Sequence, residues 1–298
     1  MSLPGRVSGC LPHTALDNEL TVASQLALRA GSVLRNYHLR SSDITRKSHG
    51  ELVTQADFES DRIIRDGLAV AFPEDGISTE ESLPTWLGSR RVWIVDPLDA
   101  TSDFVAQGTC YSVSIGLAIE GRPVLGVVYN PERDELFAGT LLHGVVLNGT
   151  RCEVTQINAL AKARIVVSRK EWERGLKRYA SFAQITPMAS FAYKLARVSA
   201  GLEDGAFSLA PRKGWGTCAG IALVRAGKGV VTTAAGLPLS LNDPSQPGAK
   251  GMVAAGPVLH PQLLNALGEL PAEIFARLAR RKTSLPGDAR KQRGYSLR

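Results

Sequence analysis

The chain has 298 residues, of which 44% are hydrophobic and 21% are charged, as in ordinary globular proteins. This composition excludes a disordered chain or a fibrous repeat, and no apolar run approaches the ~18 residues of a spanning helix. The N-terminus shows no signal-peptide pattern, and the four cysteines stand far apart. These features predict a reduced, cytoplasmic protein without a zinc site or a disulfide framework.

The net charge of +7 comes from the C-terminal tail. Eight basic residues and one acid lie between Arg277 and Arg298, so the charges of the preceding chain cancel. We expect residues 277–298 to form a disordered, solvated extension, with contact to a polyanion as the weaker alternative. No specific nucleic-acid partner is therefore predicted.

Helices come first in chain order. Apolar residues at helical spacing predict helices over 16–38 and 57–72, and an acidic loop covers 74–89. Short apolar segments then predict four strands, at 92–95, 111–119, 123–130 and 135–140. After an extension of residues 1–15, these elements predict an N-terminal lobe over 16–150.

The second half alternates between strands and helices, which predicts stacked layers. Strands are expected at 164–168, 184–187, 205–208, 229–233 and 251–255. Helices are expected at 171–180, 190–201, 215–226 and 261–278. These elements predict a C-terminal lobe over 151–276, with the boundary between the lobes near 148–163.

The strand expected at 92–95 ends in two carboxylates. Asp96 and Asp99 stand three residues apart in the segment WIVDPLDATS, residues 93–102. Pro97 has no N–H and fixes its own φ, so the chain leaves the sheet in a tight turn, and Thr101 and Ser102 favour a helix start. Such a turn places two carboxylates and a carbonyl on one side and free backbone N–H groups, which attract an anion, on the other.

Three further carboxylates precede this turn: Asp57 in LVTQAD (52–57), and Glu80 and Glu81 in STEES (78–82). Each alone is more typical of a helix cap or a solvated loop. Two charges ~4 Å apart repel by about 4 kcal/mol at an effective dielectric constant near 20, so a fold that gathers these groups must protonate some of them or hold a cation. Oxygen ligands without His or Cys favour Mg²⁺ over zinc.

The order of these motifs resembles the inositol monophosphatase superfamily, which includes inositol monophosphatases and CysQ-type 3′(2′),5′-bisphosphate nucleotidases. The matching motifs are V-T-x-x-D, E-E-S, W-I-V-D-P-L-D-x-T and a late G-W-x-x-x-A-G, and they place the resemblance over roughly residues 17–270. It implies an α+β layered sandwich (αβαβα) of two lobes and Mg²⁺-dependent hydrolysis of a small phosphorylated substrate.

The resemblance also implies roles for individual residues. The metal ligands would be the carboxylates of Glu80, Asp96 and Asp99 and the carbonyl of Leu98. Backbone N–H groups at Ala100 and Thr101, with Ser102 beside them, would bind the phosphate. Asp57 and Thr101 would orient the attacking water, and Glu81 would assist as a nearby acid.

Two residues depart from the family pattern. The late family motif is W-D-x-A-A-G, whose Asp binds a metal, and here Gly216 stands in that place. Gly216 cannot bind a metal, so we expect the second metal position to be weakened. Ala100 replaces the Gly of D-P-x-D-G-T, and it is tolerable only if its φ is negative and its methyl clears the phosphate.

Three functions remain open at this point. The first is an active or slow Mg²⁺-dependent phosphatase. We favour it because five motif residues remain: Asp57, Glu80, Asp96, Asp99 and Thr101. The second is a phosphate-binding paralogue, impaired in catalysis, with a regulatory or structural role. The third is a polyanion binder that uses the basic tail. Family members often dimerise, so a homodimer is compatible with the resemblance.

Candidate substrate contacts lie in the second half. Lys194, Arg212 and Lys213 could each meet a second phosphate, although for each a solvated surface cation is at least as common. Ser190 lies in residues 187–195, which resemble the segment before the substrate-lining helix of the nucleotidase-like branch. Inositol phosphate and 3′-phosphoadenosine 5′-phosphate both remain open as substrates.

Overall fold

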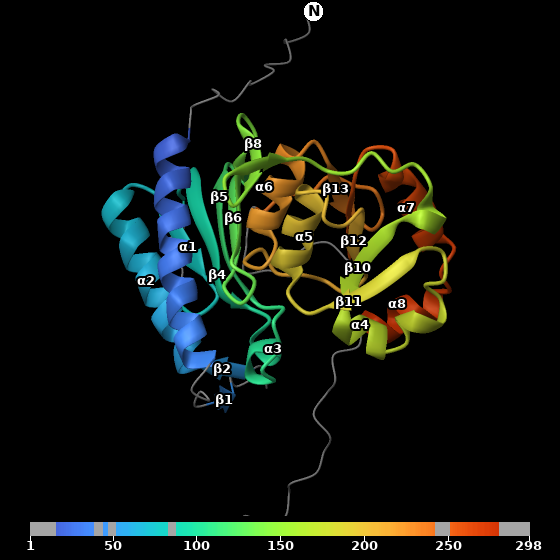
Figure 1. Cartoon of the computed structure of the whole chain (residues 1–298), viewed down its shortest axis with the longest axis horizontal. Coiled ribbons are helices and arrows are strands. Elements are labelled where there is room, and N and C mark those ends of the chain that lie inside the picture. Colours follow the sequence, from blue (N-terminus) through green and yellow to red (C-terminus); the bar gives the residue numbers. More distant parts are fainter. Residues whose placement is uncertain (1–15, 39–43, 47–51, 83–87, 242–250, 280–298) are drawn as a thin grey trace, which may run out of the picture.

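The computed structural model describes residues 16–38, 44–46, 52–82, 88–241 and 251–279. The predicted extension (1–15) and the tail from residue 280 onward lie outside the described residues, and the final helix includes residues 277–279. Helices and sheets alternate in five layers, which confirms the expected αβαβα sandwich (Figure 1). No helix in the described part of the chain is long and apolar enough to cross a membrane.

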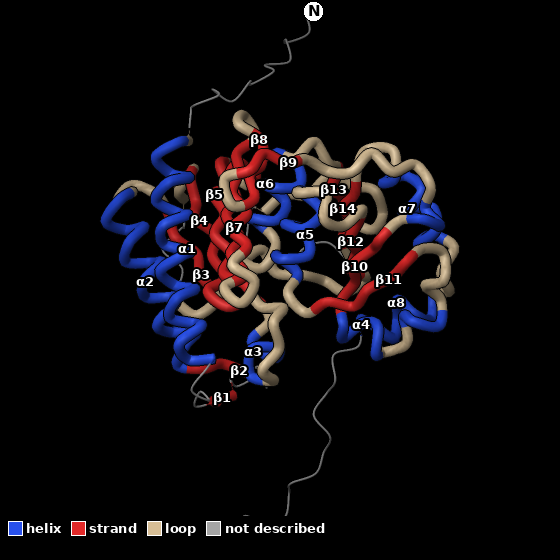
Figure 2. Tube along the Cα trace, viewed as in Figure 1, coloured by secondary structure: helices blue, strands red, loops and turns tan. Residues whose placement is uncertain are grey.

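The first sheet has seven strands that follow one another in chain order (Figure 2). They are β3 (Gly76–Thr79), β4 (Arg91–Asp99), β5 (Ser112–Ile119), β6 (Arg122–Asn130), β7 (Glu135–Thr140), β8 (Gly144–Leu147) and β9 (Thr150–Cys152). β3 is parallel to β4, and all other neighbours are antiparallel. A separate pair, β1 (Ile44–Arg46) and β2 (Leu52–Thr54), is also antiparallel.

The two faces of this sheet contribute side chains to two different hydrophobic cores, because successive side chains of a strand point to opposite faces. Trp93 and Val95 of β4 pack with the outer helices α1 (Asp17–His38) and α2 (Gln55–Ala71). Ile94, between them, packs with the middle layer instead. β4 is therefore buried on both faces, and its carboxyl end is held in the interior.

The middle layer consists of α5 (Phe191–Ser199) and α6 (Cys218–Ala226), which lie between the two sheets (Figure 1). Apart from Arg225 in its last turn, α6 consists of apolar and small residues that are all buried, as expected of a helix between two sheets. It approaches the first sheet closely: a Cβ on Gly126 would lie 2.2 Å from the carbonyl oxygen of Ala219. The two lobes are thus joined through a shared helical layer.

The second sheet has the order β11 (Gln184–Met188), β10 (Arg164–Ser168), β12 (Gly205–Ser208), β14 (Met252–Ala255) and β13 (Val230–Thr233). β10 is parallel to both of its neighbours, whereas β14 is antiparallel to both of its own. The outer face carries α4 (Arg169–Glu173), α7 (Leu259–Gly268) and α8 (Ala272–Ala279). Because β10 and β12 are parallel, their carboxyl ends lie at one edge of the sheet.

The structure corrects several predicted elements. The helix expected over 171–180 is instead α4 and a 3₁₀ turn (Leu176–Arg178), separated by Gly175 at φ 120°. The final helix is split by Pro271, which cannot continue the hydrogen-bond pattern, and the helix expected from residue 215 begins at Cys218. The acidic loop contains β3, and β8 and β9 had not been predicted.

Candidate active site

The site lies at the carboxyl end of β4, where β4 separates from the adjacent strand β5. Asp96 pairs with Ser114 and Asp99 with Ser112, so β4 has an extra residue and bulges away from β5. The Leu98 N–H donates to Asp96 Oδ1 over 3.2 Å, which closes the turn. The Ser60 hydroxyl donates to the Pro97 carbonyl over 2.9 Å, which fixes the turn against α2.

Asp57 connects the start of α2 to this turn. Its Oδ2 accepts hydrogen bonds from the N–H and the hydroxyl of Thr54, each over 2.7 Å, in a capping box. Its Oδ1 lies 3.1 Å from Thr101 Oγ1, which is also 3.2 Å from the Leu98 carbonyl oxygen. The structure thus brings together three of the predicted site residues: Asp57, Leu98 and Thr101.

Asp99 points in the other direction, toward the middle layer. Its Oδ2 accepts hydrogen bonds from the Ser190 hydroxyl over 2.6 Å and from the Ala192 N–H over 2.7 Å. Ser190 is also the N-cap of α5 and accepts the Tyr193 N–H over 3.0 Å. The carboxylate turn is therefore tied to helices from both halves of the chain.

Asp96 is the most perturbed carboxyl of the site. Burial raises its pKa well above the usual value, and the charges of Glu80, Asp99, Asp57 and Glu81 raise the pKa further. Only 5% of the residue is exposed, so water screens these charges poorly. A cation beside Asp96 would remove this penalty, and an all-oxygen donor set suits Mg²⁺.

Across the described residues, no three His, Cys, Asp or Glu side chains already surround a single metal position. Two of the carboxylates are held by other partners, Asp57 by Thr54 and Asp99 by α5. The oxygen donors present therefore fit a cation. For several carboxylates to bind the same cation, some of these side chains would have to move.

Gly216 faces this cluster directly. A Cβ at this position would lie 3.2 Å from Asp96 Oδ2 and 3.6 Å from Asp99 Oδ1. The neighbouring Trp215 is fixed by its indole N–H, which donates to Ser78 Oγ over 2.9 Å. A side chain at position 216 would therefore point into the carboxylates. Asp103 does not replace it, because its carboxylate accepts hydrogen bonds from Arg169 and from the Cys110 N–H.

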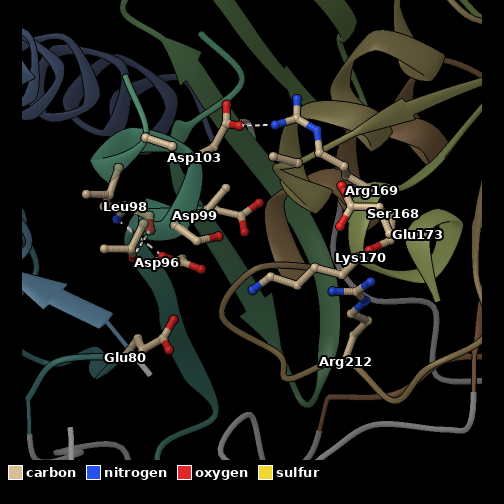
Figure 3. Close-up of a pocket in the computed structure, with 15 residues that line it drawn as sticks. Glu80, Asp96, Leu98, Asp99, Asp103, Ser168, Arg169, Lys170, Glu173 and Arg212 are labelled. Atoms are coloured by element: carbon tan, nitrogen blue, oxygen red, sulfur yellow. Dashed lines mark hydrogen bonds and ion pairs between the residues drawn. The ribbon is translucent and has the colours of Figure 1, made fainter. Parts of the chain in front are cut away.

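A cavity of about 620 Å³ opens beside the turn (Figure 3). It is lined by eight predicted site residues: Glu80, Asp96, Leu98, Asp99, Ala100, Thr101, Ser102 and Arg212. Sequence reasoning missed the other lining residues, which are Asp103, Ala106, Ser168, Arg169, Lys170, Glu173 and Ala189. Ser168 ends a predicted strand, and Arg169 and Lys170 follow it. The carboxyl ends of parallel strands commonly carry ligand contacts, so this signal could have found them.

The remaining predicted residues are not among those that line the cavity: Asp57, Glu81, Ser190, Lys194, Lys213 and Gly216. Lys194 requires a correction, because it is fully buried. Its ammonium donates to the carbonyls of Met188 and Ala189 over 2.9 and 3.1 Å, so it braces the segment before α5 and does not reach a substrate phosphate. Lys213 lies over the Trp215 ring, 4.9 Å from its centre.

Ala100 also requires a correction. Its φ is 78°, in the left-handed region, and not negative as its tolerance was expected to require. This conformation costs a residue with a Cβ roughly 1–2 kcal/mol. The turn thus places a residue with a Cβ in a conformation that favours Gly.

Replacing Ala100 with Gly should leave the free energy of unfolding unchanged or raise it by up to ~1 kcal/mol, because relief of left-handed strain outweighs the greater freedom of the unfolded chain. The control is Ala69→Gly, in an exposed part of α2, which should lower it by ~0.5–1 kcal/mol. Urea denaturation of both variants measures this. Equal destabilisation by the two substitutions would contradict the strain at Ala100.

Burial, with the Arg212 guanidinium nearby, lowers the pKa of Lys194 to about 7. The unfolded chain, with a pKa near ~10.4, binds this proton more tightly, so this group makes stability rise with pH between about 7 and 10. The free energy of unfolding of wild type, relative to Lys194→Met, should rise by ~1 kcal/mol per pH unit between pH 7 and 9. As a control, Lys177→Met, at an exposed lysine, should show the same pH dependence of the free energy of unfolding as wild type. If the free energies of unfolding of wild type and Lys194→Met differ by the same amount at every pH, the lowered pKa of Lys194 is refuted.

The chain matches the model of the inositol monophosphatase family over residues 15–272. It is 31% identical over 214 residues to a histidinol-phosphatase of Chlorobaculum parvum, covering 72% of this chain and 75% of that protein. It is 32% identical over 225 residues to the Nus factor SuhB of Salmonella typhimurium, covering 72% and 84% of the two chains.

Solved structures with the same fold are found in the same family. The extragenic suppressor protein suhB from Bartonella henselae superposes with a TM-score of 0.75 at 30% identity, over 85% of this chain and 99% of that one. An inositol monophosphatase from Anabaena superposes with a TM-score of 0.74 at 28% identity, over 87% and 98%. From its sequence and its architecture, the chain belongs to the inositol monophosphatase family.

Proposed function

We propose that this protein is a Mg²⁺-dependent phosphomonoesterase that acts on a small phosphorylated metabolite. The observation that carries the proposal is the burial of Asp96 beside four other carboxylates at the mouth of a 620 Å³ cavity. Such a cluster is costly unless a cation offsets it. Family membership supports phosphatase chemistry in general.

The proposed ligands for Mg²⁺ are the side chains of Glu80, Asp96 and Asp99 and the carbonyl of Leu98. When bound, the cation would lower the pKa of a water molecule and offset charge on the phosphoryl oxygens. The N–H groups of Ala100 and Thr101, with Ser102, would hold the phosphate.

Asp57 and Thr101 would orient the attacking water, because a 3.1 Å contact joins the Asp57 carboxylate to the hydroxyl of Thr101, which lines the cavity. Glu81 would supply a further acidic group close by. Water attacks phosphorus, the phosphorus–oxygen ester bond breaks, and the leaving alkoxide is protonated to the alcohol, so the products are inorganic phosphate and the free alcohol.

Gly216 favours a second candidate function, a phosphate-binding protein with weak catalysis and a regulatory or structural role. A carboxylate is missing where a side chain would meet Asp96 and Asp99. A relative of this chain is named a Nus factor, and another is named a histidinol-phosphatase. We favour the enzyme because five motif residues remain, namely Asp57, Glu80, Asp96, Asp99 and Thr101, and because the charges of the other three carboxylates raise the pKa of Asp96.

Phosphate release by the purified chain tests the proposed function. Inositol 1-phosphate, 3′-phosphoadenosine 5′-phosphate and histidinol phosphate are each offered with Mg²⁺ and with EDTA, and Asp96→Asn serves as the blank. Mg²⁺-dependent release above the blank is the expected result. A folded chain that releases no phosphate from any of the three would instead support the binding protein.

Gly216→Asp should raise Mg²⁺ affinity at least tenfold, because its carboxylate would enter the cluster beside Asp96 and Asp99. Without Mg²⁺ the same change should lower the melting temperature through added repulsion. The control is Gly268→Asp, at the end of α7, where an added Cβ meets nothing within 4 Å. Titration calorimetry measures the affinities, and equal Mg²⁺ affinity of Gly216→Asp and wild type would show that position 216 does not face the metal.

A further inference from the structure

The cavity has a second wall, opposite the carboxylate turn, that carries positive charge (Figure 3). Lys170 lies just after β10, and Arg212 lies just after β12. These strands are parallel neighbours, so the two cations come from adjacent loops at one edge of the second sheet. Residues from different halves of the chain thus face each other across the cavity.

Arg212 is held rigidly. Its Nε donates to Ser208 Oγ over 2.9 Å, and its Nη2 donates to Glu171 Oε1 over 3.1 Å. Its guanidinium also lies over the Phe191 ring, 5.0 Å from the ring centre. Among the described contacts, Nη1 takes part in no hydrogen bond, so one edge of a fixed guanidinium remains for a ligand. A donor that is already oriented loses little conformational freedom when it binds.

Glu171 provides this rigidity. It is 3% exposed, and it also accepts hydrogen bonds from the Ser208 hydroxyl and from the N–H groups of Leu209 and Ala210, over 2.5, 3.0 and 3.2 Å. With four donors around one carboxylate, its charge is shared among several partners. The positive charge of Arg212 therefore still attracts an additional anion.

Lys170 reaches from α4 into the cavity, beside Arg212 and toward Asp96 and Asp99 (Figure 3). No ion pair of Lys170 occurs among the described residues, whereas the adjacent Arg169 is paired with Asp103. Glu173 is the acid on the same wall. Two neighbouring cations repel each other, and an anionic group between them would relieve that repulsion.

We propose that Lys170 and Arg212 bind a second acidic group of the substrate, a phosphate or a carboxylate, while the ester phosphate is held at the carboxylate turn. This inference rests on the proposed function for the cleaved phosphate. It names the substrate class: a phosphate monoester with a second acid, in preference to one whose remainder is neutral, such as an inositol, or cationic, such as histidinol.

Two matched substrate pairs test the proposal. 3′-Phosphoadenosine 5′-phosphate and adenosine 3′-phosphate differ by the second phosphate, and 3-phosphoglycerate and glycerol 1-phosphate differ by a carboxylate. The measured quantity is the ratio of kcat/KM within each pair, with Mg²⁺, for wild type, Arg212→Gln and Lys170→Gln. The control is Lys177→Gln, an exposed lysine outside the cavity lining. Lys170 is exposed, so its variant remains informative if loss of the Arg212 partner of buried Glu171 prevents folding.

We expect wild type to favour the member with the second acid at least tenfold in one of the pairs, which also tells phosphate from carboxylate. Each cavity variant should reduce this ratio about tenfold, as expected for a lost charged hydrogen bond, and Lys177→Gln should retain it. Turnover without a preference for the second acid, or a preference that both cavity variants keep, would overturn the subsite and leave the phosphatase intact.

If wild type releases phosphate from none of the four compounds, nor from inositol 1-phosphate or histidinol phosphate, the phosphatase proposal fails, and binding then decides the subsite. Calorimetry of the same pairs with the same variants should show tighter binding of the compound with the second acid. That difference should be lost in Lys170→Gln. Equal affinities within both pairs would overturn the second-acid subsite as well.

Discussion

The structure depends on one costly feature, a carboxyl buried among other carboxylates. Asp96 lies at the end of a strand covered on both faces, and burial and the charges of its neighbours both raise its pKa. The bulge in β4, the capping box of α2 and the N-terminus of α5 all contribute to holding this arrangement. A bound cation would offset this repulsion, as the proposed function requires.

Much of this site is predictable from the sequence because it is local. Asp96, Leu98, Asp99 and Thr101 lie within six residues, so one turn places them, and the helix start at Asp57 is a recognisable cap. The opposite wall is not local. Lys170 and Arg212 reach the cavity only because β10 and β12 pair in parallel, and that pairing is set by tertiary packing. Lys194 was misassigned because its helix lies between two sheets, where the residue is fully buried, and the neighbouring sequence does not reveal this.

The two departures from the family pattern lie at the same site and have different consequences. Ala100 adopts a left-handed backbone that Gly would tolerate better, so the turn is formed at the cost of strain. Gly216 removes a carboxylate that would touch Asp96 and Asp99, so it lowers the repulsion and also the number of metal ligands. The carboxylate site is therefore less crowded and faces a cationic wall, and the proposed second-acid subsite rests on this arrangement.

The central claim is that the carboxylates around Asp96 exist to hold a cation, and thermal unfolding tests it without any substrate. Melting temperatures are measured for wild type and Asp96→Asn in Mg²⁺ and in EDTA. We predict that Mg²⁺ raises the melting temperature of wild type by several °C, as selective binding to the native state requires. Asp96→Asn should be more stable than wild type in EDTA and should lose the response to Mg²⁺. A wild-type chain indifferent to Mg²⁺, or a variant that responds equally, would contradict the account.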